Sequence, residues 1–226
     1  MKTPILVGDS VTLSLGGRTI LDSAYADAVP GAITALVGRS GCGKTTFFKV
    51  LVGERRPDLG QVRWRGTRLA RPRLSDLARD GLFYHPDRAW LARHLSFNDH
   101  IALCPHEDWT SVVDVFGIGG WVGQQVGRLS EGELRLTELA FGFAMRPAVA
   151  VLDEPFRGLE PLHREQVGRG LRELADRGAA ILYADHDVES VRRTADRLFS
   201  MENGMTRMVE GFKTRPLHEW YHAWPR

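Results

Sequence analysis

The sequence predicts an α/β domain in which a largely parallel sheet is flanked by helices, and three observations support this fold class. Apolar runs at residues 32–37, 148–152 and 180–184 have the length and composition of buried parallel strands. A glycine-rich loop and then a helical pattern follow the first run directly. The length of 226 residues, without a linker-like stretch in the middle, favours one domain with an insertion over two domains.

The glycine-rich loop at residues 38–45 is a complete phosphate-binding (Walker A) loop. Glycines let its backbone curl so that successive N–H groups converge on phosphate oxygens, and the following helix adds partial positive charge. We expect Lys44 to reach the β and γ phosphates, Thr45 to offer its hydroxyl to Mg²⁺, and Thr46 to contact the α phosphate. The sequence therefore predicts a nucleoside triphosphate site formed by Gly38, Arg39, Ser40, Gly41, Cys42, Gly43, Lys44, Thr45 and Thr46.

An acidic pair, Asp153 and Glu154, ends the second apolar run. A carboxylate at the end of a strand beside a phosphate loop can hold Mg²⁺ directly or through water, and a second carboxylate can polarise the attacking water. We therefore assign Asp153 to the metal and Glu154 to catalysis.

The overall composition limits the partners and the compartment. Thirty basic and 28 acidic residues leave a net charge of +2, so the chain as a whole gives no electrostatic case for nucleic acid. The first residues lack a signal-peptide pattern, and no apolar run is long enough to span a bilayer, so we expect a cytoplasmic protein. Cys42 and Cys104 suggest neither a disulfide framework nor a metal site, and both are expected to be reduced.

A third motif, Leu-Ser-Glu-Gly-Glu at residues 129–133, precedes a helical pattern and then the acidic pair. With the phosphate loop, this order resembles the nucleotide-binding domain of ATP-binding cassette (ABC) proteins, as do Gly31, residues 157–160 at the D-loop position and His186 after the third apolar run. The resemblance implies a P-loop NTPase core of the ABC type, with a mixed sheet flanked by helices and an N-terminal antiparallel β subdomain. It also implies that residues 1–226 form one cassette, with a helical subdomain inserted at about 88–146.

Site residues follow from the same resemblance. Ser130 and Gly132 are expected to bind the γ phosphate held by a second cassette, either an identical copy or a paralogue, in a head-to-tail dimer. His186 is expected to contact the γ phosphate and orient the water together with Glu154, while Lys44 counts as catalytic as well as phosphate-binding. The implied cofactors are ATP and Mg²⁺.

Four positions depart from the usual family letters. Asp87 stands where the Q-loop normally has glutamine and is expected to ligate the metal, with His85 as the alternative if the loop register slips by two. Glu131 replaces a signature glycine and adds negative charge, and Glu160 replaces the D-loop aspartate. Leu15 stands where an aromatic residue usually stacks on adenine, so it is expected to give apolar contact only.

Partners are also implied by the family. In transporters, the helical subdomain and Q-loop form a groove for a coupling helix of the transmembrane permease subunits, and Trp90, Trp109 and Trp121 are either anchors there or core residues. The arginine-rich segment 55–73 is either a solvated edge or a contact with anionic lipid, and nucleic acid is the weaker partner. The aromatic segment 217–224 is expected to dock on the cassette's own surface or on a dimer partner.

We therefore predict the ATP-binding and ATP-hydrolysing subunit of an ABC transporter, peripheral on the inner face of the cell membrane. A non-transport ABC ATPase acting on nucleic acid, ribosomes or an assembly pathway is the alternative. A binding module without hydrolysis is disfavoured by the presence of Lys44 and Glu154.

Overall fold

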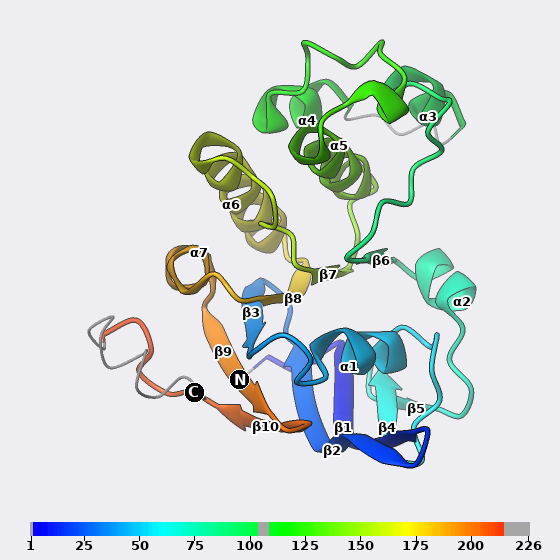
Figure 1. The fold of residues 1–226 in the computed structure, drawn as a ribbon, viewed down its shortest axis with the longest axis vertical. Coiled ribbons are helices and arrows are strands. Elements are labelled where there is room, and N and C mark those ends of the chain that lie inside the picture. The colour runs from blue at the N-terminus through cyan, green and yellow to red at the C-terminus, as the bar shows by residue number, and fades with distance from the viewer. Residues whose placement is uncertain (1, 104–108, 215–226) are drawn as a thin grey trace.

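The structure is a computed structural model that describes residues 2–103 and 109–214 (Figure 1). Its elements are, in chain order, β1 (Leu6–Leu15), β2 (Arg18–Ala28), β3 (Ala32–Val37), α1 (Lys44–Leu51), β4 (Leu59–Trp64), β5 (Thr67–Leu69), α2 (Leu74–Arg79), β6 (Leu82–His85), α3 (Phe97–Leu103), α4 (Trp109–Phe116), the 3₁₀ helix η1 (Val126–Arg128), α5 (Glu131–Ala144), β7 (Val149–Asp153), α6 (Pro161–Asp176), β8 (Ala180–Asp185), α7 (Val188–Thr194), β9 (Arg197–Glu202) and β10 (Met205–Met208). Cys104 and the segment 217–224 lie outside the described residues.

The central layer is a six-stranded mixed sheet in the order β10-β9-β3-β8-β7-β6. All neighbouring pairs are parallel except β9 with β10. The three predicted apolar runs form β3, β7 and β8, and every residue of β7 and β8 is buried, as expected for parallel strands covered on both faces. The carboxyl ends of these strands lie at one edge of the sheet, which brings the loops that follow them together.

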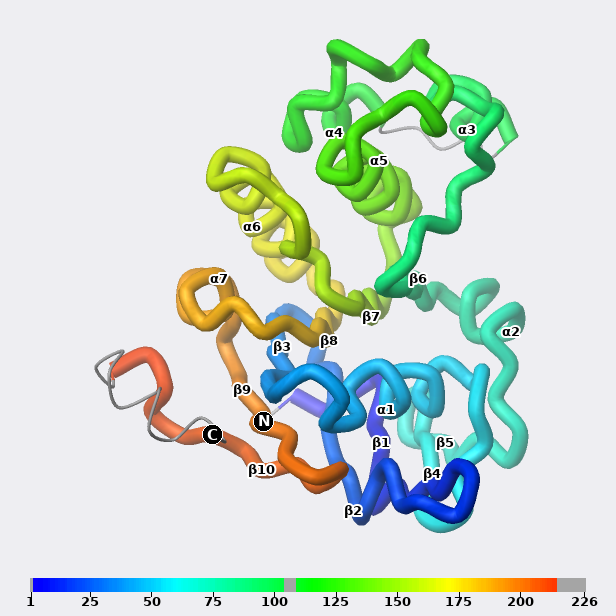
Figure 2. Tube along the Cα trace, in the orientation of Figure 1, coloured from blue at the N-terminus to red at the C-terminus, as the bar shows by residue number. Residues whose placement is uncertain are grey.

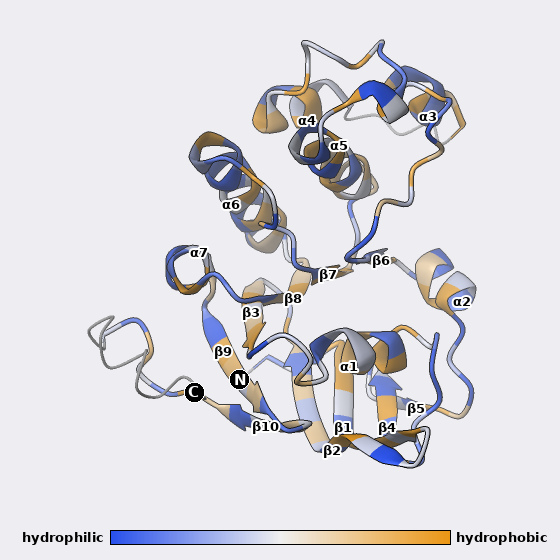
Figure 3. Ribbon diagram, in the orientation of Figure 1, coloured by the Kyte–Doolittle hydropathy of each residue, from blue (hydrophilic) through white to orange (hydrophobic). Residues whose placement is uncertain are grey.

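Each face of this sheet has its own apolar core. Ile33 and Ala35 of β3 pack with residues of α5 and α6, whereas Leu36 packs with α1 and the second sheet. This alternation follows from the two-residue period of a strand. In Figure 3, α5 and α6 carry both hydrophobic and hydrophilic residues, as helices that cover a core do.

The second sheet is four-stranded and antiparallel, in the order β2-β1-β4-β5. Its β1–β2 hairpin turns at Gly16 and Gly17, whose φ angles of +57° and +79° fit the two-glycine turn favoured between antiparallel strands. Leu15 and Arg18 face each other across this turn. This sheet confirms the expected N-terminal antiparallel subdomain.

Helices α3, α4 and α5 gather at one end of the molecule, where the chain leaves β6 and returns to β7 (Figures 1 and 2). Two of the three tryptophans pack inside this helical group. The Trp109 ring lies 5.7 Å from that of Phe97, and the Trp121 indole donates to the Thr137 hydroxyl over 3.0 Å. Trp90 is 38% exposed and remains accessible to a partner.

Candidate nucleotide site

The phosphate loop joins β3 to α1 and depends on its glycines. Gly41 and Gly43 have φ angles of +81° and +116°, a region that residues with a side chain rarely adopt. At Gly38 the requirement is space, because a Cβ there would lie 2.4 Å from the carbonyl oxygen of Met201. The loop can therefore hold its shape only with glycine at these positions.

The Lys44 side chain turns back into this loop from the first residue of α1. It is 6% exposed, and its Nζ donates to the carbonyl oxygens of Gly38 at 2.7 Å and Arg39 at 3.1 Å. The ammonium group is thus held inside the loop, where a phosphate group would form charge-assisted hydrogen bonds with it.

The other predicted residues of the phosphate loop differ in their exposure. Arg39, Ser40 and Gly41 are exposed, and the Cys42 free thiol is half-buried with its Sγ 3.9 Å from the Lys44 Nζ. Thr45 and Thr46 follow in the first turn of α1. Both threonine residues are half-buried.

Asp153, at the end of β7, is a buried carboxylate without a hydrogen-bond partner. The residue is fully buried, and neither carboxylate oxygen has a partner among the described protein groups. The pKa of Asp153 is raised to about 6, chiefly by burial; the nearby charges of Asp87 and Glu154 act in the same direction, and Thr45 and Lys44 act in the opposite direction. The cost of an unpaired buried charge predicts that a cation belongs beside this side chain.

The residues around Asp153 fit Mg²⁺. Thr45 and Asp87 both lie close enough to influence its pKa, so the structure brings together the three residues assigned to the metal. No cluster of three or more His, Cys, Asp or Glu side chains suited to a metal occurs in residues 2–103 and 109–214. Mg²⁺ is usually held by one or two carboxylates together with substrate phosphates and several waters, and the carboxylates of Asp153 and Asp87 are donors of that kind.

Glu154 lies between two basic side chains. Its Oε1 is 3.6 Å from the Nδ1 of His186, and its Oε2 is 3.6 Å from a guanidinium nitrogen of Arg157. Its φ of +51° is unusual for a residue with a side chain and is retained because the Glu154 N–H donates to the Ala184 carbonyl oxygen over 2.9 Å. The strained backbone places the carboxylate at the strand edge beside Asp153.

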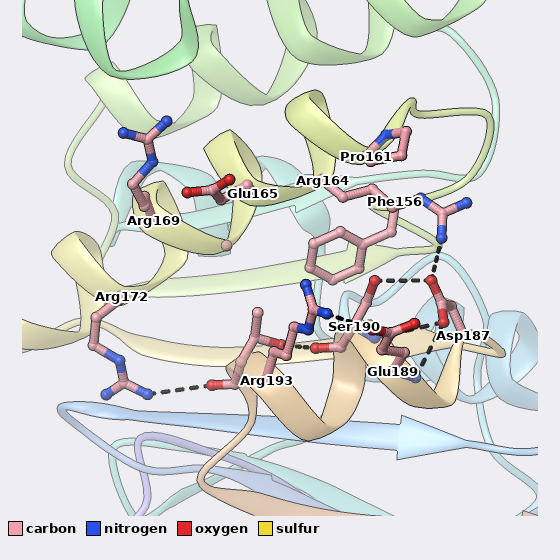
Figure 4. Close-up of a pocket in the computed structure, with 12 residues that line it drawn as sticks. Phe156, Pro161, Arg164, Glu165, Arg169, Arg172, Asp187, Glu189, Ser190 and Arg193 are labelled. Atoms are coloured by element: carbon pink, nitrogen blue, oxygen red, sulfur yellow. Dashed lines mark hydrogen bonds and ion pairs between the residues drawn. The ribbon is translucent and has the colours of Figure 1, made fainter.

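The loop that carries His186 is fixed on both sides. Asp185 Oδ1 accepts hydrogen bonds from the backbone N–H groups of His186 at 2.7 Å and Asp187 at 2.9 Å. Asp187 caps α7 and pairs with Arg164 of α6 (Figure 4). The imidazole itself stays 60% exposed, so it is positioned by the backbone and open to a ligand.

A groove of about 430 Å³ between α6 and α7 adjoins this loop (Figure 4). Three of its arginines are already paired with carboxylates: Arg164 with Asp187, Arg172 with Asp196 and Arg193 with Glu189. No residue of the phosphate loop lines it. We therefore assign the groove a role in fixing α7, and no role in binding the nucleotide.

Asp87 and His85, the two candidate metal ligands at the Q-loop, have different surroundings. Asp87 is close to Asp153, whereas the His85 ring is completely buried with its Nε2 3.3 Å from the Glu138 carboxylate of α5. Burial lowers the pKa of His85 against the opposing effect of Glu138. His85 is therefore engaged with α5 while Asp87 lies with the acidic pair.

The signature residues lie at the start of α5. Ser130 is the N-cap, with its hydroxyl accepting from the Glu133 N–H at 3.3 Å and the Glu133 carboxylate accepting from the Ser130 N–H at 2.8 Å. Gly132 follows in the first turn. The Glu131 carboxyl lies beside Gly158, where an added Cβ would be 3.7 Å from its Oε1.

Leu15 and Glu160 are the remaining departures from the family pattern. Leu15 is 38% exposed at the β1–β2 turn, open to a base. Glu160 is exposed and stands as the N-cap of α6 without a side-chain capping bond, directly before Pro161.

Sequence reasoning gave no role to two buried charged residues on α5, Arg135 and Glu138. Both occupy positions within an otherwise apolar helical stretch, and their spacing of three residues places them on one face. The sequence signal that could have identified them is a pair of opposite charges at helix positions where apolar, core-facing residues are expected. Arg157, beside Glu154, was likewise noted only as part of the D-loop segment.

Comparison with known proteins gives a consistent answer. A family model described as "ABC transporter" matches residues 21–157. The Streptomyces avermitilis protein named aliphatic sulfonates import ATP-binding protein SsuB 1 is 33% identical over 207 residues, covering 87% of this chain and 73% of that protein. The Acidithiobacillus ferridurans lipopolysaccharide export system ATP-binding protein LptB is 29% identical over 213 residues, covering 88% and 87%.

Solved structures have the same fold. A structure described as the ATP-binding subunit of an ABC transporter gives a TM-score of 0.83 at 22% identity, covering 97% of this chain and 98% of the other. The ADP conformation of the cassette MJ1267 gives 0.82 at 20% identity, covering 98% and 99%. Among the helices of the described residues, none combines the length and the apolar character that crossing a membrane requires.

Proposed function

Because this chain belongs to the ABC transporter family, we propose that it is the ATP-hydrolysing subunit of a transporter and drives separate permease subunits by ATP-dependent pairing of two cassettes. Its relatives include ATP-binding subunits named for import and for export. The proposal treats residues 1–226 as one cassette with the helical subdomain inserted at about 88–146. We expect the permease subunits to determine the transported substrate and the direction of transport.

The observation that carries the proposal is the group of charged residues around Asp153. Lys44 is held inside the phosphate loop, Asp153 is buried without a partner, and Glu154 lies at the same edge of the sheet with His186 3.6 Å away. A protein that only bound a nucleotide would have no use for this second carboxylate.

The position of each side chain suggests its role in hydrolysis. Mg²⁺, held by Thr45, Asp153 and Asp87, would neutralise charge on the β and γ phosphates. Lys44 supplies a fixed positive charge to the same phosphates. Glu154 polarises the attacking water and accepts its proton, while His186 hydrogen-bonds the γ phosphate and keeps Glu154 oriented.

A second copy or a paralogue completes the site. Ser130 and Gly132 stand at the start of α5, whose N–H groups and partial positive charge suit the γ phosphate held by the other cassette. In Figure 1, α5 belongs to the helical group, apart from α1 and its own phosphate loop. This separation supports a head-to-tail dimer with two ATP molecules between the subunits.

The permease would dock beside the Q-loop, and Trp90 is a partly exposed aromatic residue there. The neighbouring helix α2 packs against β6, and residues 55–73 that lead to it contain seven arginines and one acidic residue, Asp58. Such a basic edge favours the anionic inner face of the cell membrane. We therefore propose a cytoplasmic subunit that is peripheral to the membrane, recovered together with its permease from membranes.

Replacing Glu154 by Gln tests the proposal. Turnover should fall at least about 100-fold, because the water loses its base, whereas ATP binding and ATP-dependent dimerisation should remain. Steady-state ATPase assays, nucleotide binding and size-exclusion chromatography with ATP measure these effects. Glu165→Gln on α6 is the matched control and should retain wild-type turnover; unchanged turnover in Glu154→Gln would reject the assignment.

A further inference from the structure

Two buried charges on α5 are not explained by the apolar core around them. Arg135 is 5% exposed and Glu138 is 1% exposed, and they lie three residues apart on one face of the helix. Burying a charged side chain is costly unless its hydrogen-bonding groups find partners. The partners of these two residues therefore indicate what the pair is for.

Arg135 binds backbone on two different loops. One guanidinium nitrogen donates to the Asp87 carbonyl oxygen at 2.8 Å, and the other lies 3.0 Å from the Glu154 carbonyl oxygen and 3.5 Å from that of Asp153. Asp87 and Asp153 are assigned to the metal, and Glu154 is the proposed catalytic carboxylate. Arg135 thus binds the backbone of all three residues. Because Arg135 donates to carbonyl oxygens, these hydrogen bonds do not use the carboxylates of Asp87, Asp153 and Glu154.

Glu138 holds the chain on both sides of Asp87. Its Oε1 accepts from the backbone N–H groups of Trp90 at 2.7 Å and Leu91 at 3.3 Å, and its Oε2 lies 3.3 Å from the Nε2 of His85. With Arg135, it attaches the segment 85–91 to α5 before, at and after Asp87. The His85 side chain before Asp87 and the backbone at Trp90 and Leu91 after it cannot shift without breaking a buried polar contact.

We propose that Arg135 and Glu138 are positioning residues, which set Asp87 and Glu154 in the geometry needed for the metal and the attacking water. This inference rests on the proposed function and extends it to residues outside the nucleotide site. A displacement of catalytic groups by about 1 Å can cost about 100-fold in rate, so contacts of this kind matter although neither side chain touches ATP.

The same helix also carries Ser130 and Gly132, less than two turns before Arg135. Because an α-helix of this length moves as a rigid body, a γ phosphate that binds these residues in the partner's site also fixes Asp87 and Glu154 in this chain's own site. The pair thus provides a physical link by which occupation of one nucleotide site favours hydrolysis at the other.

Glu138→Ala tests the proposal by removing every contact from this side chain to segment 85–91. We expect kcat to fall about tenfold or more, and the Mn²⁺ concentration for half-saturation in the presence of ATP, measured by electron paramagnetic resonance, to rise about tenfold. Metal-free binding of a fluorescent ATP analogue should change less than about twofold, because Lys44 and the phosphate loop are untouched. Glu138→Gln retains an oxygen for Trp90 and Leu91 and should restore most of both losses.

Arg135→Lys is the second variant, because a single ammonium cannot reach carbonyl oxygens on both loops. It should raise the Mn²⁺ requirement and lower kcat in the same direction. Thr137→Val is the matched control on the same helix: its side chain is equally buried but bonds within the helical group to Trp121. It should leave kcat and Mn²⁺ binding near wild type, and thermal unfolding should show that all variants are folded.

Wild-type Mn²⁺ binding and kcat in folded Glu138→Ala and Arg135→Lys would overturn the proposal, as would equal losses in Glu138→Gln and Glu138→Ala. If the wild-type chain bound Mn²⁺ and ATP without turnover, the proposed function would fail instead. The metal-binding comparison among the variants would still test the positioning role.

Discussion

The phosphate loop and the signature segment each lie at the start of a helix, but the two helices begin differently. Helix α1 has a left-handed glycine, Gly43, as its N-cap, no side-chain capping bond and no acidic residue in its first turn. Helix α5 has a complete capping box between Ser130 and Glu133, and both Glu131 and Glu133 stand in its first turn. The N-terminus of α1 is therefore open to an anion. At the N-terminus of α5, the side chains of Ser130 and Glu133 already form hydrogen bonds with the backbone N–H groups.

The difference indicates which site binds phosphate first. Free N–H groups and a favourable helix dipole make the α1 end an anion site by itself. At α5 a phosphate must displace the Ser130–Glu133 contacts, worth about 1 kcal/mol, and approach two carboxylates. ATP should therefore bind the phosphate loop of a single chain and engage the signature only in the dimer.

The largest expected effect compares one glycine from each helix start. Gly43→Ala should weaken ATP binding to the isolated chain about 100-fold, because its φ of +116° is strained for alanine and its Cβ would lie 3.0 Å from the Ile20 carbonyl oxygen. Gly132→Ala should leave the same affinity unchanged, since its nearest contact would be 3.4 Å. Isothermal titration with ATP measures both, and equal losses would remove the distinction between the helix starts.

Asp153, at the predicted nucleotide site, is a buried carboxylate whose charged form is unfavourable. The folded pKa of Asp153, about 6, lies above its ordinary value of 3.8, so the folded chain binds more protons than the unfolded chain between these pH values. The free energy of unfolding should therefore fall as pH rises through this window. Asp153→Asn should be more stable than wild type by about 2–3 kcal/mol at pH about 7.5 without nucleotide or metal, and about equal at pH about 3.5.

Urea unfolding at the two pH values measures this difference, with Asp196→Asn, which weakens an ion pair with Arg172, as a control that should not stabilise the chain. An Asp153→Asn protein no more stable than wild type at the higher pH would mean that the buried carboxylate carries no such cost.

A smaller effect is expected at the signature. Glu131→Gln and Glu133→Gln together remove two negative charges from the first turn of α5, while the new amide at position 133 can still complete a capping box. In a chain that also carries Glu154→Gln, the dimer should form at about fivefold lower ATP concentration, since each charge near a helix start contributes about 0.3–1 kcal/mol. Analytical ultracentrifugation across an ATP titration measures the ATP concentration at which the dimer forms. If the variant needed a higher ATP concentration than the parent, the Glu131 and Glu133 carboxylates would assist dimer formation.

The smallest effect concerns the base. Leu15→Phe restores an aromatic ring at the β1–β2 turn and should tighten ATP binding about threefold, because stacking adds about 0.5–1 kcal/mol to apolar contact. Titration of ATP and GTP separately measures the change and its preference for adenine. An unchanged affinity for both nucleotides would mean that the base does not reach this turn.

The part of the site that the sequence predicted is the part built from short segments. The phosphate loop needs glycine at Gly41 and Gly43 for conformations that are local, and the acidic pair ends a strand whose neighbours are set by parallel pairing. The contacts of Arg135 join residues 48 and 19 positions apart, so no local pattern specifies them. The same holds for His85, whose partner on α5 is brought to it only by the folding of the helical group.

The central claim, that each site is completed by a second cassette, is tested most directly by mixing two inactive variants. Lys44→Ala removes phosphate binding, and Gly132→Asp places a carboxylate at the signature. In a head-to-tail heterodimer of the two, one site keeps both an intact phosphate loop and an intact signature. An equal mixture should therefore recover up to about a quarter of wild-type ATPase activity, and less where one site assists the other. A mixture that forms heterodimers by affinity pull-down but stays as inactive as either variant alone would contradict the account.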